Sequence, residues 1–176
     1  DWILQTPGRN TSHGRYQYVL DFSRKEVVDH IYGMMAKLLS ESKISYIKWD
    51  MNRSITECYS SKLPSDRQGE VFHRYILGVY DLYERLTNEF PEVLFESCAS
   101  GGGRFDPGML YYAPQGWTSD DSDAIERLKI QYGTSMCYPL SSMGSHVSVV
   151  PNHQVFRNTP LHTRANVAYF GTFGYE

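Results

Sequence analysis

The chain has 176 residues and a mass of 20.3 kDa, which is the length of one domain or of a piece of a larger one. Hydrophobic residues make up 41% and charged residues 21%, a composition that excludes a disordered chain. The formal net charge of −3 argues against a nucleic-acid partner, and no apolar run approaches the roughly 20 residues of a membrane helix.

The first residue is Asp1 rather than Met, so we expect a piece of a longer protein, whose missing part could have carried a signal peptide. The three cysteines, Cys58, Cys98 and Cys137, have no CxxC spacing. This pattern disfavours a disulfide framework or a zinc site and favours reduced thiols in a cytoplasmic protein.

Two helices and one strand are expected in the first half of the chain. A capping box, Ser23 with Glu26, predicts a helix start, and an apolar stripe from Val27 to Leu39 continues it. A strand over 44–49 ends at Asp50. A second apolar stripe predicts a helix over 66–89.

The second half begins with two expected strands, one over 93–98 and one over 115–119. A helix should follow, with Asp123 as its N-terminal cap and Gly133 just beyond its C-terminal end. The prolines between 134 and 160 predict long loops.

The chain should close with a helix over 161–170 and a strand from 173. Strands alternating with long helices predict an α/β fold with a parallel sheet, in which functional groups gather at the carboxyl ends of strands. Three expected strands run into the polar clusters 48–50, 96–98 and 119–121, which neighbouring strands would bring together.

Asp50 and Asp120 are the candidate catalytic pair. Two carboxyl groups can divide glycosidic hydrolysis, one attacking the anomeric carbon and one protonating the leaving oxygen. Lys48 and Arg53 would keep Asp50 ionised, and the acidic neighbours of Asp120 would raise the pKa of one carboxyl group in that cluster. A structural alternative stays open, in which Asp50 pairs with these cations and the later acidic cluster only caps a helix.

The other motifs give weaker indications of function. The run of glycines over 101–103 lacks the endings of a nucleotide-binding loop, so it predicts either a tight turn or a close approach to a ligand. Scattered histidines without helical spacing predict no metal site, and no cofactor is expected. Trp117 lies close to Asp120 and could serve as a sugar platform or as part of the core.

Three segments resemble glycoside hydrolase family 36, the microbial α-galactosidases. They are residues 46–53, YIKWDMNR; residues 96–106, ESCASGGGRFD; and residues 117–123, WTSDDSD. The resemblance continues through HVS at 146–148 to GTFGYE at 171–176 and so covers the whole chain. It implies a (β/α)8 barrel, of which residues 1–176 would form a single-domain fragment from about strand 3 to the start of strand 8, without the family's flanking domains.

The resemblance also implies the reaction and the roles of residues. It implies a retaining α-galactosidase that releases terminal α-linked galactose, as from melibiose or raffinose, through a covalent intermediate on Asp50, with Asp120 as acid and base. The residues that would hold the sugar are Arg15, Lys48, Asn52, Cys98, Gly101 and Trp117. The whole protein would be a homo-oligomer, commonly a tetramer, and the isolated fragment could be inactive.

Two other functions stay open. A galactosyl transferase or raffinose-type synthase would use the same two aspartates, with a sugar instead of water intercepting the intermediate. A non-catalytic galactose-binding module would need the aromatic residues and Arg15 but not both carboxylates, so the intact aspartate motifs disfavour it.

Overall fold

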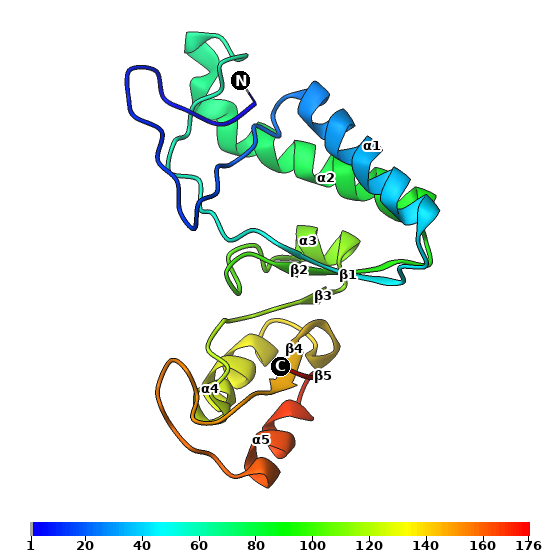
Figure 1. The fold of residues 1–176 in the computed structure, drawn as a ribbon, viewed down its shortest axis with the longest axis vertical. Coiled ribbons are helices and arrows are strands. Elements are labelled where there is room, and N and C mark those ends of the chain that lie inside the picture. Colours follow the sequence, from blue (N-terminus) through cyan, green and yellow to red (C-terminus); the bar gives the residue numbers. More distant parts are fainter. Residues whose placement is uncertain (1) are drawn as a thin grey trace. The chain divides into compact units, whose positions relative to one another are not determined.

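The computed structural model describes residues 2–176 and divides them into two compact units (Figure 1). One unit contains the described residues up to Ile47 together with Met51–Leu94. The other contains Lys48–Asp50 and Phe95–Glu176. The last three residues of the first strand therefore belong to the second unit, which also holds both candidate catalytic aspartates.

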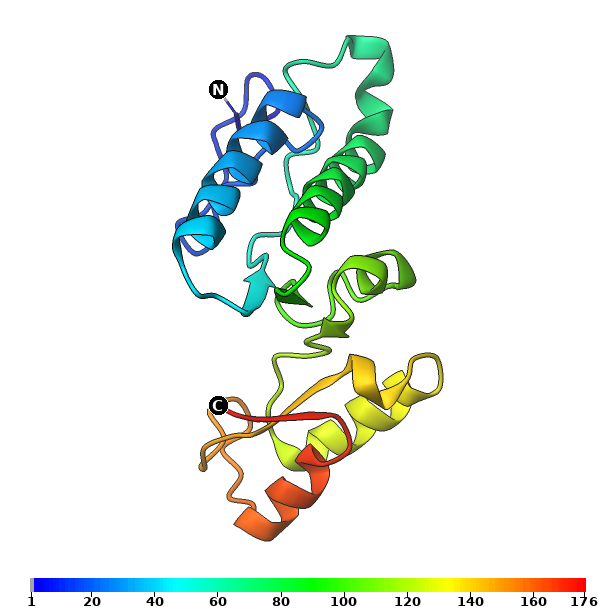
Figure 2. The same ribbon diagram turned by 90° about the vertical axis from the view of Figure 1, so that its right-hand side faces the viewer.

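The first unit is built on a pair of helices, α1 (Lys25–Glu41) and α2 (Val71–Glu89), which lie side by side (Figures 1 and 2). A 3-10 helix, η1 (Ser65–Glu70), leads into α2. The residues that the two helices bury are Val27, Val28 and Leu39 from α1, and Val71, Tyr75, Val79, Leu82, Tyr83 and Leu86 from α2. The predicted helix over 66–89 is thus confirmed, although its first turn is of the tighter type.

The predicted capping box at the start of α1 is wrong. Arg24 occupies the N-cap position without a side-chain cap hydrogen bond. The Ser23 hydroxyl instead donates to the Asp21 carboxylate, and Glu26 accepts from Arg24 Nε at 2.9 Å. Asp21 is buried in this loop, and its carboxylate accepts the hydrogen bond of the Ser23 hydroxyl, which the sequence pattern had assigned to the start of the helix.

A three-stranded sheet has the order β1 (Tyr46–Asp50), β2 (Leu94–Cys98) and β3 (Gln115–Gly116). β2 and β3 pair in parallel, with Glu96 opposite Gln115. A short helix, α3 (Pro107–Tyr112), which the sequence did not predict, connects them. β3 is shorter than the predicted strand over 115–119, because the chain leaves the ladder after Trp117 N donates to Ser97 O at 2.9 Å.

The end of the chain forms a second parallel pair, β4 (Gly144–Val147) with β5 (Thr172–Tyr175). The helices of this region are α4 (Ala124–Ser135) and α5 (Leu161–Ala168), with a 3-10 turn, η2 (Leu140–Ser142), before β4. β4 lies within the segment predicted as loops.

The two ends predicted for α4 have different outcomes. Asp123 caps the helix as predicted, because its carboxylate accepts from Ile125 N and Glu126 N, both at 3.1 Å. Gly133 does not end the helix but lies inside it, and Met136 is the C-cap. Helices between parallel strands nevertheless confirm the predicted α/β fold.

Two further findings concern the described residues as a whole. The three cysteines, Cys58, Cys98 and Cys137, are free thiols. Within residues 2–176, no helix combines the length and apolar character that crossing a membrane requires.

Candidate active site

The ends of β1 and β2 place Asp50 beside the loop that begins at Cys98. Asp50 is the last residue of β1, and its Oδ1 lies 3.4 Å from the backbone nitrogen of Ser100. Arg104 ties the two strand ends together, since its guanidinium donates to Cys98 O at 2.8 Å and to Trp49 O at 3.4 Å. The Asp50 side chain stays exposed, so a substrate can reach it.

The Cys98 thiol is a neutral neighbour of Asp50. Burial is the main reason that its pKa rises to about 11, and the hydrogen bond to the Asp50 carboxylate acts in the same direction. The thiol therefore keeps its proton at neutral pH. A protonated thiol can donate to a carboxylate, and it does not compete with Asp50 as an anionic nucleophile.

The glycine-rich turn after β2 packs against the segment that carries Asp120. Gly101 has a left-handed backbone, with φ +80°, and a Cβ there would lie 2.8 Å from Ser119 Cα and 2.9 Å from Asp120 N. A Cβ at Gly102 would lie 2.7 Å from Thr118 O. Only glycine permits this approach, so the turn contacts Asp50 through Ser100 and Asp120 through Gly101.

Lys48 points from β1 to two groups of the neighbouring strands. Its Nζ lies 3.8 Å from Glu96 Oε1 and 4.7 Å from the centre of the Trp117 ring. Glu96 is only 1% exposed, and burial raises the pKa of its carboxyl group to about 7, against the effect of a hydrogen bond from Gln115. Lys48, a candidate sugar-binding residue, thus contacts a buried carboxyl group.

Trp117 is enclosed by side chains rather than open to solvent. It is 3% exposed, its ring stacks on His146 with 4.5 Å between centroids, and the Arg127 guanidinium lies 4.4 Å from its centre. Burial is the first cause that lowers the pKa of His146, and the nearby positive charge of Lys48 adds to it. The indole therefore contacts the candidate site through Lys48.

Arg127 is a site residue that sequence reasoning missed. It is 2% exposed and donates to Ser119 O at 3.0 Å and to Gly144 O at 2.7 Å. Burial lowers the pKa of its guanidinium to about 10. By holding the carbonyl of Ser119, Arg127 fixes the residue before Asp120. Nothing in the sequence distinguishes it from the exposed Lys129 two positions later.

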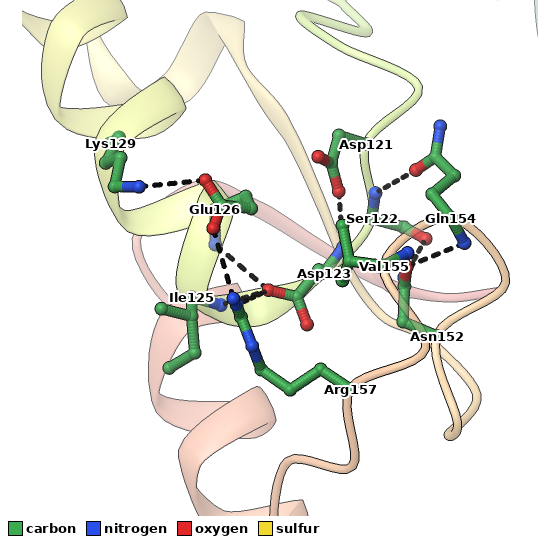
Figure 3. A network of polar contacts seen from close by, with 10 residues as sticks. All are labelled: Asp121, Ser122, Asp123, Ile125, Glu126, Lys129, Asn152, Gln154, Val155 and Arg157. Carbon is green, nitrogen blue, oxygen red and sulfur yellow. Dashed lines mark hydrogen bonds and ion pairs between the residues drawn. The ribbon is translucent and has the colours of Figure 1, made fainter.

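The acidic residues after Asp120 serve the fold (Figure 3). Asp123 is buried, caps α4 and forms an ion pair with Arg157, which also pairs with Glu126 at 3.3 Å. Hydrogen bonds from Asn152 Nδ2 to Ser122 Oγ and from Ser122 N to Gln154 Oε1 join the same segment to a distant loop. Asp123 therefore has the structural role of a helix cap that the sequence left open, whereas the Asp120 side chain is exposed.

The remaining predicted residues belong to the first unit. Arg15 is exposed and has a left-handed backbone, with φ 52°, and Asn52 is half-buried. Arg53, expected to support Asp50, is buried and serves its own loop, since it donates to Ser12 O at 2.9 Å and to Thr56 Oγ1 at 2.8 Å. Among residues 2–176, no group of three or more His, Cys, Asp or Glu side chains could hold a metal ion.

Comparison with known proteins assigns the class. The model of the melibiase family matches residues 1–176, and the chain belongs to that family. It is 58% identical to α-galactosidase AgaA of Geobacillus stearothermophilus and 57% identical to α-galactosidase Mel36A of Lactobacillus acidophilus, in each case over 100% of this chain and 24% of the relative. The chain therefore spans about a quarter of the length of these relatives.

Solved structures agree with this assignment. The crystal structure of AgaA, a GH36 α-galactosidase, matches with a TM-score of 0.97 over 100% of this chain and 24% of that chain, at 58% identity. A structure of an AgaA variant in complex with raffinose matches with a TM-score of 0.96 over 99% of this chain and 24% of that chain, also at 58% identity. Residues 2–176 therefore have the α/β fold of the matching quarter of these GH36 structures.

Proposed function

We propose that the whole protein is a retaining α-galactosidase that releases terminal α-linked galactose from oligosaccharides. One observation carries the proposal: the turn after β2 contacts Asp50 through Ser100 N at 3.4 Å and the backbone of Asp120 through Gly101. Two exposed carboxyl groups on either side of one turn suit glycosidic hydrolysis. Relatives that are named α-galactosidases, and that bind raffinose and stachyose in their crystal structures, support the same chemistry.

In the first step, an oxygen of the Asp50 carboxylate attacks the anomeric carbon while the bond to the leaving oxygen breaks. Asp120 gives its proton to that oxygen, so that the aglycone departs as an alcohol. In the second step, Asp120 takes a proton from water, whose oxygen displaces Asp50 and frees galactose with its configuration retained. The mechanism requires the two carboxyl groups to lie about 5–5.5 Å apart.

The environment of Asp50 suits a nucleophile. A carboxylate that accepts from the Ser100 N–H and the Cys98 thiol is held in one orientation. Lys48, two residues earlier on β1, lies on the same face of the strand as Asp50. For sugar binding we propose the residues named by the family resemblance, namely Arg15, Lys48, Asn52, Cys98, Gly101 and Trp117, the last of which acts through its contact with Lys48.

We further propose that residues 1–176 are part of one catalytic (β/α)8 barrel, from about strand 3 to the start of strand 8. The parallel pairs β2–β3 and β4–β5, with helices between them, fit such a barrel. The carboxyl ends of barrel strands are where catalytic residues gather, and Asp50 ends β1. A homo-oligomeric, cytoplasmic protein is part of the same proposal.

Hydrolysis of an aryl α-galactoside by the whole protein tests the function. We expect activity in the wild type and a loss of about 10⁴-fold or more in Asp50→Ala, because the covalent intermediate can no longer form. Asp66→Ala, at an exposed position of η1, is the matched control and should keep wild-type activity. Retained hydrolysis in Asp50→Ala would remove Asp50 from the reaction, and galactosyl transfer exceeding galactose release would favour a transferase.

A further inference from the structure

Glu96 is a buried carboxyl group in the middle of β2 that takes no part in the reaction proposed above. It is 1% exposed, and an ionised carboxylate in such surroundings needs a charged or hydrogen-bonding partner. A charged group that faces it is the ammonium group of Lys48, with Nζ 3.8 Å from Oε1. This ion pair links the buried Glu96 side chain to Lys48, which precedes the proposed nucleophile Asp50 by two residues.

The Glu96 carboxyl group accepts a hydrogen bond from β3 and is closely approached by the backbone of β4. Gln115, its register partner on β3, donates from Nε2 to Oε2 at 2.8 Å. On β4, a Cβ at Gly144 would lie 3.5 Å from Glu96 Oε1, 3.6 Å from Gln115 Nε2 and 3.1 Å from the Trp117 ring. The absence of a side chain at Gly144 thus leaves the carboxyl group and the indole enough space, but little freedom to move.

Lys48 needs such a support because its side chain is long and flexible. A lysine ammonium group can adopt many positions, and ordering it costs conformational entropy when a ligand binds. Here two contacts order it before binding, the Glu96 carboxylate and the Trp117 ring face, 4.7 Å from Nζ. Because 35% of the Lys48 side chain stays exposed, it remains accessible to a ligand.

We propose that Glu96 is a positioning residue that holds the Lys48 ammonium group, together with Trp117, in the orientation that binds a hydroxyl group of the substrate galactose. The inference rests on the proposed function, since it assigns Lys48 to the sugar. Glu96 acts only through Lys48 and does not touch the reacting atoms. Its contribution is uniform binding energy, which is equal in the ground state and the transition state, so its loss should appear in KM rather than in kcat.

A double-mutant cycle tests this dependence. We would measure kcat and KM for an aryl α-galactoside at pH 8, where the Glu96 carboxyl group is mostly ionised, with the whole protein as wild type, Glu96→Gln, Lys48→Met and the double variant. In Glu96→Gln, which keeps the size and the contact with Gln115, we expect KM to rise about 10-fold with kcat changed less than about 3-fold. In the Lys48→Met background, the same change should alter KM by less than about 2-fold, because the group it positions is gone.

Two further variants complete the test. Glu70→Gln removes the carboxylate of the last residue of η1, which pairs with Arg67 and Arg74 away from the candidate site, and it should leave KM unchanged. Glu96→Asp keeps the charge but withdraws it by one methylene, so KM should rise by less than in Glu96→Gln; this variant carries the test if Glu96→Gln does not fold.

Opposite results separate the two claims. An unchanged KM in Glu96→Gln, or an equal loss with and without Lys48, would overturn the positioning role while leaving the proposed function intact. Absence of α-galactoside hydrolysis in the wild type would overturn both.

Discussion

The helix pair α1–α2 and the segments that carry Asp50 and Asp120 place their charged side chains differently; Asp50 ends β1, whereas Asp120 follows β3 by four residues. On the helices, Asp29 pairs with Lys25 at 2.6 Å and with Arg85 at 2.8 Å on the surface. Exposed ion pairs of this kind contribute about 1 kcal/mol or less to stability. Near the candidate site, Glu96 in the middle of β2 and Arg127 on α4 are buried; Glu96 pairs with Lys48, and Arg127 donates to the carbonyl of Ser119, next to Asp120. The charged groups of this helix surface are exposed, whereas those that support the candidate site are buried.

The glycines of the two regions differ in the space around their Cα atoms. Gly33, inside α1, has no atom within 4 Å of the position that a Cβ would take. At Gly101, the same position lies 2.8 Å from the backbone of Ser119. A glycine on the helix can therefore be replaced freely, whereas the glycine of the turn is required by the close approach of two segments.

The largest expected effect is the loss of stability when a buried arginine is replaced, compared with the loss at an exposed arginine. Arg127→Met should lower the free energy of unfolding by about 3–4 kcal/mol, because the carbonyls of Ser119 and Gly144 lose their buried donor. Arg85→Met, on α2, should cost about 1 kcal/mol or less. Denaturant unfolding of the whole protein measures both, and equal losses would contradict the distinction between the two regions.

The second prediction concerns the glycines. Gly101→Ala should lower hydrolysis of an aryl α-galactoside about 100-fold, because a shift of the turn displaces Asp120 relative to Asp50. Gly33→Ala is the matched control and should keep activity while stabilising α1 by about 0.5–1 kcal/mol. Wild-type activity in Gly101→Ala would show that the turn does not set the position of Asp120.

The third prediction is a pH dependence of stability. Burial raises the pKa of Glu96 to about 7 from its usual value near 4.5, so between these pH values the folded protein keeps a proton that the unfolded chain releases. Its contribution to stability therefore declines as the pH rises through this window. Glu96→Gln cannot titrate and should gain about 1–2 kcal/mol relative to the wild type between pH 5 and pH 8.

The matched control for this prediction is Glu70→Gln on the exposed helix start. Hydrogen bonds from Arg67 and Arg74 lower the pKa of Glu70, so its contribution is present above the usual glutamate value and is lost only in more acidic solution. Unfolding curves of Glu70→Gln should therefore run parallel to the wild type from pH 5 to pH 8. A parallel curve for Glu96→Gln as well would refute the raised pKa of Glu96.

The smallest effect is expected for the surface pair at Asp29. Asp29→Asn should lower stability only slightly, and the difference should shrink further in 0.5–1 M salt because exposed charges are screened. A loss as large as that of Arg127→Met, persisting at high salt, would show that the helix pair depends on its ion pairs as the region around Glu96 and Arg127 does.

Part of this fold was predictable from local pattern. The apolar stripes predicted α1 and α2, and short apolar runs ending in polar clusters predicted β1 and β2 with Asp50 at a strand end. The resemblance of three motifs then assigned the family, which the comparisons confirmed. These signals are local in sequence, so a single chain contains them.

What was missed depends on contacts between distant segments. Strand β4 contains Gly144 and polar residues that read as a loop, and it is a strand because β5 pairs with it. The hydroxyl of Ser23 was assigned to a helix cap, but the buried Asp21 is a stronger acceptor nearby. Arg127 looks like any surface residue of a helix until the carbonyls that it binds are known.

The most direct test of Asp50 as the nucleophile is the site at which the sugar becomes covalently attached. The whole protein would be treated with a 5-fluoro-α-galactosyl fluoride, whose glycosyl-enzyme hydrolyses slowly, and then digested and analysed by mass spectrometry. We predict one fluorogalactosyl group per chain, on the peptide that contains Asp50, and no label in Asp50→Ala. A label on another peptide, or an equal label in Asp50→Ala, would contradict the assignment of Asp50 as the nucleophile.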